Sequence, residues 1–324
     1  MQRNIAINTA SSNTAPSDRP DPSTDRSRRP SPATSNRTPV YWNEHFLASR
    51  YAFDTTRKSA LVVDQIKEED LNVELVDPAT FADETERLIG TVHDGAYVEA
   101  VRTGEPLDRA ESQGFSWDEG IYPMALAHNS GLVAAVHDVL SGRVKVAGSL
   151  SSGLHHARAR EGRGYCTFNG LAVAARAALD EGANRILILD FDAHGGGGTR
   201  SLLAPDQVTQ IDVSTNPFDR WTPEGSDSYR LVDADDYLPA ISDALDRAEE
   251  TGPFDLVLYN AGMDPVTDSG VSPTTITHRE SQVARWATAR GWPLVYTLAG
   301  GYEHGRYRLD DVATLHTLTV KAFA

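Results

Sequence analysis

The sequence predicts an α/β fold, a single three-layer domain whose central, mostly parallel sheet carries helices on both faces. Short apolar runs typical of buried strands alternate with stretches of helical spacing, which is the pattern of a parallel sheet covered by helices. The clearest run is Ile186–Leu189, and polar side chains follow it directly. The chain has 324 residues, of which 40% are hydrophobic, enough for one large core. No internal repeat interrupts this pattern.

The individual elements follow from apolar spacing and from glycine or proline at segment ends. We expect one short strand between Val40 and Asp77 and further strands at 144–150, 186–189, 208–213, 255–259 and 293–298. We expect helices at 60–70, 120–141, 171–179, 199–204, 238–250, 278–290 and 309–323, and a helix–loop–helix over 82–103. The helix at 120–141 has apolar residues spaced for one face and is predicted to be amphipathic. The stretch 214–229 is rich in turn-forming residues.

Residues 1–39 differ in composition from the rest of the chain. They are rich in Ser, Thr, Asn, Pro and Arg and nearly lack large apolar side chains. Such a segment cannot bury enough surface to offset its ordering entropy, so we predict a disordered tail before a domain at 40–324. No apolar h-region of a secretory signal is present. An organelle transit peptide is an alternative, although such peptides avoid acidic residues.

Charge and cysteine content narrow the class of protein. The formal net charge of -16 should repel nucleic acid and anionic membrane surfaces, so we expect neither as a direct partner. No apolar run approaches the ~20 residues that span a bilayer. Cys166 is the single cysteine, so no internal disulfide can form, which fits a reducing compartment and an expected cytoplasmic location. We expect Cys166 to be a small buried residue rather than a nucleophile.

Chemistry-bearing side chains follow four of the expected strands. Asp190, Asp192 and His194 alternate after one strand, so in extended backbone their side chains point the same way. The pair His155-His156, Asp264 and Tyr302 follow three others. Polar residues that end a strand are often only caps and turn formers, but neighbouring parallel strands would bring these loops together at one edge.

Such a cluster would suit metal-assisted amide hydrolysis. Asp192, His194 and Asp264 form a three-ligand set that leaves a position open for water, as a catalytic Zn²⁺ site needs. Two imidazoles nearby could move protons, and a phenol could stabilise an oxyanion.

Five motifs in order resemble one known family. They are GLHHAR at 153–158, GYC at 164–166, DFDAH at 190–194, AGMD at 261–264 and AGGY at 299–302. This series is similar to that of the zinc-dependent histone deacetylase superfamily, which includes histone deacetylases, acetoin-utilisation proteins and acetylpolyamine amidohydrolases. The resemblance covers residues 40–324. It implies an arginase-like α/β fold and a hydrolase that removes the acetyl group from acetyl-lysine, an acetylated polyamine or another small acylated amine.

The resemblance also implies roles for individual residues. Asp192, His194 and Asp264 would bind Zn²⁺, with Fe²⁺ or Co²⁺ as alternatives. His156 would be the general base and acid, and His155, oriented by Asp190, its electrostatic partner. Tyr302 would donate a hydrogen bond to the oxyanion. The substrate channel would be formed by Gly164, Tyr165 and Gly300. The carboxylate of Asp190 and the main-chain carbonyls of Asp192 and His194 resemble a monovalent-cation site for K⁺, to which Asp212 or Ser214 could contribute.

One position departs from the family pattern. The family side chain that orients the proton-transferring histidine matches Gly197, which has no side chain. Either another group, such as a water or a carboxylate from elsewhere, replaces it, or catalysis is slow. Gly197 also supports the hypothesis of a catalytically weak protein that binds acetylated ligands. A separate hypothesis is a di-manganese ureohydrolase, which shares the DAH motif at 192–194. The oligomeric state cannot be predicted from the sequence.

Overall fold

The computed structural model describes residues 37–50 and 54–324, and most of the predicted tail at 1–39 therefore lies outside the described residues. Within them, eight strands form one sheet in the order β2-β1-β3-β8-β7-β4-β5-β6, and every neighbouring pair is parallel. The strands are β1 (Thr38–Tyr41), β2 (Val73–Val76), β3 (Val146–Ser152), β4 (Ile186–Asp190), β5 (Val208–Ser214), β6 (Ser228–Leu231), β7 (Leu256–Gly262) and β8 (Leu294–Ala299).

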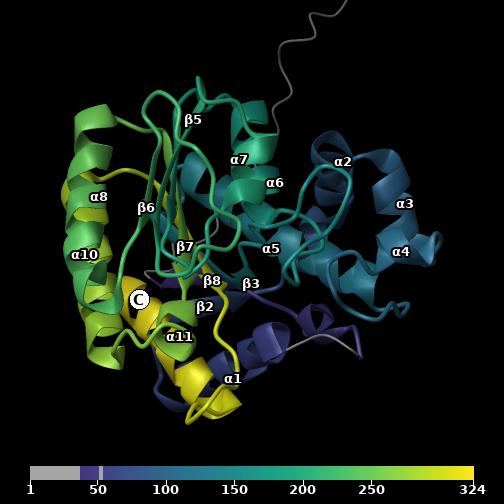
Figure 1. Ribbon diagram of the computed structural model, residues 1–324, viewed down its shortest axis with the longest axis horizontal. Helices are drawn as coiled ribbons and strands as arrows, with labels where there is room; N and C mark the ends of the chain where they lie inside the picture. Colours follow the sequence, from purple (N-terminus) through teal and green to yellow (C-terminus); the bar gives the residue numbers. More distant parts are fainter. Residues whose placement is uncertain (1–36, 51–53) are drawn as a thin grey trace, which may run out of the picture. The chain divides into compact units, whose positions relative to one another are not determined.

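Helices cover both faces of this sheet (Figure 1). The α-helices are α1 (Asp54–Glu68), α2 (Ala82–Val92), α3 (Gly95–Thr103), α4 (Leu107–Ala110), α5 (Ile121–Leu140), α6 (Gly170–Asp180), α7 (Gly197–Leu202), α8 (Tyr237–Thr251), α9 (Asp264–Thr267), α10 (Pro273–Arg290) and α11 (Leu309–Phe323). Short 3₁₀ helices are η1 (Glu44–Leu47), η2 (Pro78–Phe81) and η3 (Ala234–Asp236).

The strand side chains divide the core into two apolar clusters. In β4, Leu187 and Leu189 join the cluster that packs against α1, α8, α10 and α11. Ile186 and Ile188 join the opposite cluster, which packs against α2, α3, α5 and α6. Because successive side chains of a strand point to opposite faces, a continuous apolar run is what a strand covered on both sides requires. The predicted three-layer α/β architecture is therefore confirmed, and the sheet is parallel throughout.

Some sequence expectations about elements are wrong in detail. One strand was expected between Val40 and Asp77, but β1 and β2 both form there, and β1 begins at Thr38, inside the segment assigned to the tail. β6 forms at the end of the stretch 214–229, which was expected to be rich in turns and for which no strand was predicted. These strands have four residues each, too few for a clear periodic signal.

The helix predicted at 120–141 is present as α5, but it is not amphipathic. It is buried on nearly all sides because it packs between β3, α2 and α6, and even its polar residues His128, Asn129 and Ser130 are buried. α10 begins at Pro273, five residues before the expected 278, because Ser272 caps it and Pro273 occupies the first turn. Within the described residues, no helix combines the length and apolar character needed to cross a membrane.

The sheet order brings the predicted functional loops together. β3, β8, β7 and β4 are consecutive neighbours, so the loops after them leave the same edge side by side. These loops carry His155-His156, Tyr302, Asp264 and the Asp190–His194 segment, respectively. The expected convergence of polar side chains at the carboxyl ends of the strands is therefore present.

Candidate active site

Three side chains converge as a group able to hold a metal ion. Among the described residues, Asp192, His194 and Asp264 have ligand atoms that all lie within 4.8 Å of one another. The Nδ1 atom of His194 is 3.0 Å from Oδ1 of Asp192 and 3.2 Å from Oδ2 of Asp264. Asp192 and His194 come from the β4 exit, and Asp264 begins α9 after β7. These are the three residues that the sequence nominated as metal ligands.

The charge of this group fits a divalent cation. Two buried carboxylates face one imidazole, which leaves an excess of negative charge away from water. Burial and the neighbouring Asp192 raise the pKa of Asp264 to about 6, even though His194 opposes this. Burial disfavours a charged His194, but hydrogen bonds to Asp192 and Asp264 outweigh it and raise the pKa of that imidazole to about 11. The site thus attracts a positive charge strongly, and a metal ion bound there would replace that proton.

Gly300, which was predicted to contact substrate, packs against the carboxylate of Asp264. It has a φ of +53°, and a Cβ there would lie 2.2 Å from Oδ1 of Asp264. The backbone N–H of Gly301 donates to the same carboxylate, while the carbonyl of Gly300 accepts from Lys58 and His316. A glycine at 300 therefore lets the loop after β8 approach Asp264. Its predicted contact with substrate stays a prediction.

The two adjacent histidines differ in their partners. Nδ1 of His155 is 2.6 Å from Oδ2 of Asp190, and Asn260 donates to the other oxygen of that carboxylate at 2.8 Å. Nδ1 of His156 is 3.0 Å from Oδ2 of Asp219. The two rings lie 4.0 Å apart between centroids. The expected pairing of His155 with Asp190 is present, whereas the partner of His156 comes from a loop that the sequence had not nominated.

The protonation of the two rings diverges. Burial opposes a charge on His155, but the Asp190 carboxylate outweighs it and raises the pKa of His155 to about 9. Burial and the positive charge of His155 lower the pKa of His156 to about 4, although Asp219 opposes this. The two pKa shifts have opposite directions, which favours the charged form of His155 and the neutral form of His156.

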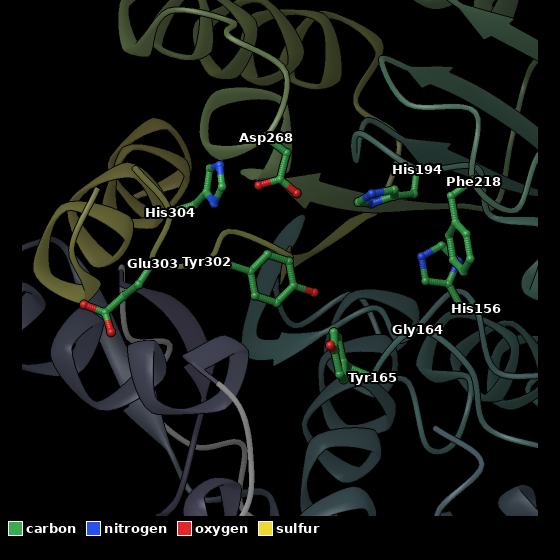
Figure 2. Close-up of a pocket in the computed structure, with 9 residues that line it drawn as sticks. All are labelled: His156, Gly164, Tyr165, His194, Phe218, Asp268, Tyr302, Glu303 and His304. Carbon is green, nitrogen blue, oxygen red and sulfur yellow. The ribbon is translucent and has the colours of Figure 1, made fainter. Parts of the chain in front are cut away.

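A cavity of about 580 Å³ lies beside His156 and His194 (Figure 2). It is lined by His156, Gly164, Tyr165, His194, Phe218, Asp268, Tyr302, Glu303 and His304. Figure 2 shows the hydroxyl of Tyr302 directed toward the side of the cavity where His156 and His194 lie. Burial, and then the charge of Asp264, raise the pKa of Tyr302, which keeps this phenol protonated and able to donate.

Aromatic rings form the walls of this cavity, and acidic groups lie at its outer part. Tyr165 is 6.1 Å from Tyr302 between ring centroids, and Phe218 is 4.9 Å from His156. Exposed Asp268 and Glu303 add negative charge. Gly164 and Tyr165 were nominated from the sequence. Phe218, Asp268, Glu303 and His304 were not, because no pattern links them to the motifs.

Two further expectations concern Cys166 and the monovalent-cation site. Cys166 is buried, and burial raises the pKa of its thiol, which agrees with a small core residue. Asp212 accepts hydrogen bonds from Gly196 and Trp221 at 2.8 and 2.7 Å. Burial, and then the charge of Asp190, raise the pKa of Asp212 to about 8. A contribution of Asp212 or Ser214 to K⁺ binding stays a prediction.

Comparison with known proteins identifies the family. Residues 52–226 match the model of the histone deacetylase domain, more than half of the chain. The chain belongs to the histone deacetylase family. Histone deacetylase 2 of Arabidopsis thaliana is 32% identical over 183 residues, which cover 52% of this chain and 47% of that protein. Acetoin utilization protein AcuC of Staphylococcus aureus (strain COL) is 31% identical over 150 residues, 43% of this chain and 38% of that protein.

These alignments span less than half the length of either relative. A solved structure covers more of the chain. The crystal structure of an acetylpolyamine aminohydrolase from Burkholderia pseudomallei has a TM-score of 0.71 at 19% identity, covering 88% of this chain and 98% of that one. At this identity the likeness concerns the fold, which the family members share.

Proposed function

We propose that this protein hydrolyses an N-acetyl amide, that of acetyl-lysine, of an acetylated polyamine or of another small acylated amine. The observation that carries the proposal is that His156 and His194 line one cavity with their rings 5.7 Å apart between centroids, and that His194 forms a three-residue group with Asp192 and Asp264 behind it. The names of the relatives, histone deacetylase and acetylpolyamine aminohydrolase, support the same reaction class. The catalytic unit in this proposal is residues 40–324.

Asp192, His194 and Asp264 would hold the metal ion, which we propose to be Zn²⁺, with Fe²⁺ or Co²⁺ as alternatives. When bound, such an ion polarises the acyl carbonyl and lowers the pKa of water, the two effects that amide hydrolysis needs. Two carboxylates and one imidazole are a donor set that zinc accepts.

His156 takes the proton from the attacking water and returns it to the leaving amine. Its Nδ1 is held by Asp219, so Nε2 is the ring nitrogen available for proton transfer. His155, charged through Asp190, provides positive charge beside it. Tyr302 donates its hydroxyl hydrogen to the oxyanion that forms as the carbonyl is attacked.

The cavity suits an acyl amide with a cationic remainder. Tyr165 and Phe218 provide apolar faces for an alkyl chain, and Asp268 and Glu303 attract a positive charge near the opening. This acidic lining supports an acetylated polyamine, whose other amines stay protonated, more directly than acetyl-lysine, whose acylated side chain carries no charge.

The test is an activity screen on the full chain with metal content measured in parallel. We expect turnover of a fluorogenic acetyl-lysine amide or of N-acetylated polyamines, about one metal per chain, and loss of turnover with a chelator that added Zn²⁺ restores. Tyr302→Phe should lower kcat by about 10²–10³-fold, as loss of an oxyanion donor does.

Other outcomes would contradict the proposal. Two manganese ions per chain with urea-releasing activity would favour the ureohydrolase, and saturable binding of acetylated ligands without turnover would favour the binding protein. Full activity of Tyr302→Phe would remove the role given to that hydroxyl. Dependence of activity on K⁺ is the corresponding test for the monovalent-cation site.

A further inference from the structure

The side chain that holds His156 comes from the loop after β5. Oδ2 of Asp219 accepts from Nδ1 of His156 and from the backbone N–H of Gly198, each at 3.0 Å. Oδ1 accepts from Arg158, and Arg163 lies 3.7 Å away. The side chain of Asp219 is 1% exposed. This carboxylate is therefore enclosed by donors, and the two arginines balance its charge.

The glycine run packs directly on this loop. The N–H of Gly195 donates to the carbonyl of Phe218 at 3.0 Å, and the N–H of Gly197 donates to the carbonyl of Asp219 at 3.1 Å. A Cβ at 197 would lie 2.5 Å from that carbonyl oxygen and 2.9 Å from Oδ1 of Asp219. A side chain at 197 and Asp219 in its present place therefore exclude each other.

We propose that Asp219 is the positioning residue of His156, and that Gly197 is the complementary change that makes room for it. In the family pattern the side chain that orients this histidine matches position 197. Here the same contact is made from a different strand exit. The inference rests on the proposed function, because it assigns Asp219 to the histidine that transfers the proton.

The chemistry of the contact explains why a carboxylate is needed. An acceptor at Nδ1 fixes the tautomer that carries hydrogen there and leaves Nε2 unprotonated for proton transfer. Arg158 also donates to the carbonyl of Gly197 at 3.3 Å, so it ties the glycine run to the carboxylate. The carboxylate, the arginine and the glycine run thus form one unit around the ring of His156.

Asp219→Asn in the metal-loaded full chain tests the proposal. The amide keeps the volume, but its NH₂ group must face either Arg158 or the donors His156 and Gly198. We expect kcat to fall about 10–100-fold, with little change in KM, as is usual when an outer partner of a catalytic histidine is lost.

Asp227→Asn is the matched control. The Asp227 side chain is also 1% exposed and pairs with an arginine, Arg200, at 3.0 Å, but it contacts none of the site histidines. We expect this variant to keep the wild-type kcat even if it melts earlier. An equal fall of kcat in both variants, or an unchanged kcat in Asp219→Asn, would overturn the proposal.

Gly197→Ala is a second variant, for use if Asp219→Asn does not fold. It removes no polar group, yet it should push the Asp219 loop away and lower kcat. Gly90→Ala, where an added Cβ meets nothing within 4 Å, should leave kcat unchanged. Wild-type kcat in Gly197→Ala would contradict the proposed complementarity.

A readout independent of turnover separates this inference from the proposed function. In protein labelled with ¹⁵N-histidine, the resonance assigned to His156 by its absence in His156→Ala should show the Nδ1–H tautomer. Asp219→Asn should shift it toward a tautomer mixture, and Asp227→Asn should not. If the wild type lacks turnover but shows these shifts, the proposed function fails and the positioning role stands. If the wild type turns over and Asp219→Asn shows neither effect, the positioning role alone fails.

Discussion

Two groups of imidazoles in this protein are both shielded from water but have different neighbours. The site group comprises His155, His156 and His194, and the body group comprises His93, His128 and His316. Each site imidazole contacts at least one carboxylate. Each body imidazole contacts a backbone carbonyl instead: His93 that of Arg158, His128 that of Phe46 and His316 that of Gly300.

A carboxylate partner separates the site imidazoles from the body imidazoles, whereas both groups share burial. Burial lowers the pKa of His93 and His128 to about 4, so both are neutral packing groups. Carboxylates raise the pKa of His155 to about 9 despite similar burial. His156 is the exception, because burial and the charge of His155 keep its pKa at about 4 beside a carboxylate. Of these six imidazoles, only His156 combines a lowered pKa, a carboxylate that orients the ring and a position in the cavity wall.

The largest effect is expected for the exceptional imidazole. His156→Ala should lower kcat by about 10²–10⁴-fold because it removes the proton-transfer group. The melting temperature should change little, since the ring lines a cavity. Steady-state kinetics and thermal melts check both parts. Wild-type turnover in this variant would remove His156 from the mechanism.

A body imidazole should show the reverse pattern. His128→Ala removes a buried ring that packs 4.6 Å from Phe46 and donates to its carbonyl at 3.1 Å. The lost packing and hydrogen bond should lower the free energy of unfolding by about 2–4 kcal/mol. The kcat of the folded fraction should match the wild type. Denaturant unfolding and active-site-normalised kinetics test this, and a large fall in kcat would erase the distinction between the groups.

Acid should destabilise the fold through the body group. The pKa of His93 is lowered from 6.5 to about 4 by burial. Below pH 6.5 the unfolded chain therefore binds a proton that the native state does not, and stability falls as the pH drops toward 4. The loss is about 3 kcal/mol for this imidazole at pH 4.

His93→Gln tests this linkage. In the wild type, Nδ1–H donates to the carbonyl of Arg158 at 2.9 Å and Nε2 accepts from Asn169 at 3.0 Å. Glutamine also carries a donor and an acceptor but does not titrate, so the free energy of unfolding should fall less between pH 7 and 5. Parallel pH profiles for the two proteins would show that His93 is not a source of the acid sensitivity.

The smallest effect is expected for an imidazole outside both groups. His304 lines the cavity but is exposed. His304→Ala should change stability by no more than about 0.5 kcal/mol, as for most surface positions. The kcat/KM should also change by about 2-fold at most, which corresponds to a change of about 0.5 kcal/mol in the activation free energy, because this exposed ring has no proposed role in the reaction. A larger fall in kcat/KM would mean that an exposed imidazole in the cavity wall can have a catalytic role.

The layer architecture and most residues of the proposed site could be predicted from the amino-acid sequence. Short motifs predict these residues, because side-chain alternation along a strand and the loop at its end are local properties. They are Asp190, Asp192 and His194, the pair His155-His156, Asp264 and Tyr302. The ordered motifs also placed the chain in its family, which the match at 52–226 confirms.

The residue that packs against Gly197 could not be predicted from the sequence, because the folding of distant segments places it there. Asp219 is separated from His156 by 63 positions and lies in a turn-rich stretch with no periodic signal. The glycine run at 195–198 shows that no side chain occupies these positions, but it does not indicate which loop packs against them. The same reason applies to α5, because its burial on nearly all sides depends on packing against β3, α2 and α6 and not on its own apolar pattern. The spacing of residues along a strand determines the direction of a side chain. The residue that it contacts depends on how segments distant in the sequence pack together.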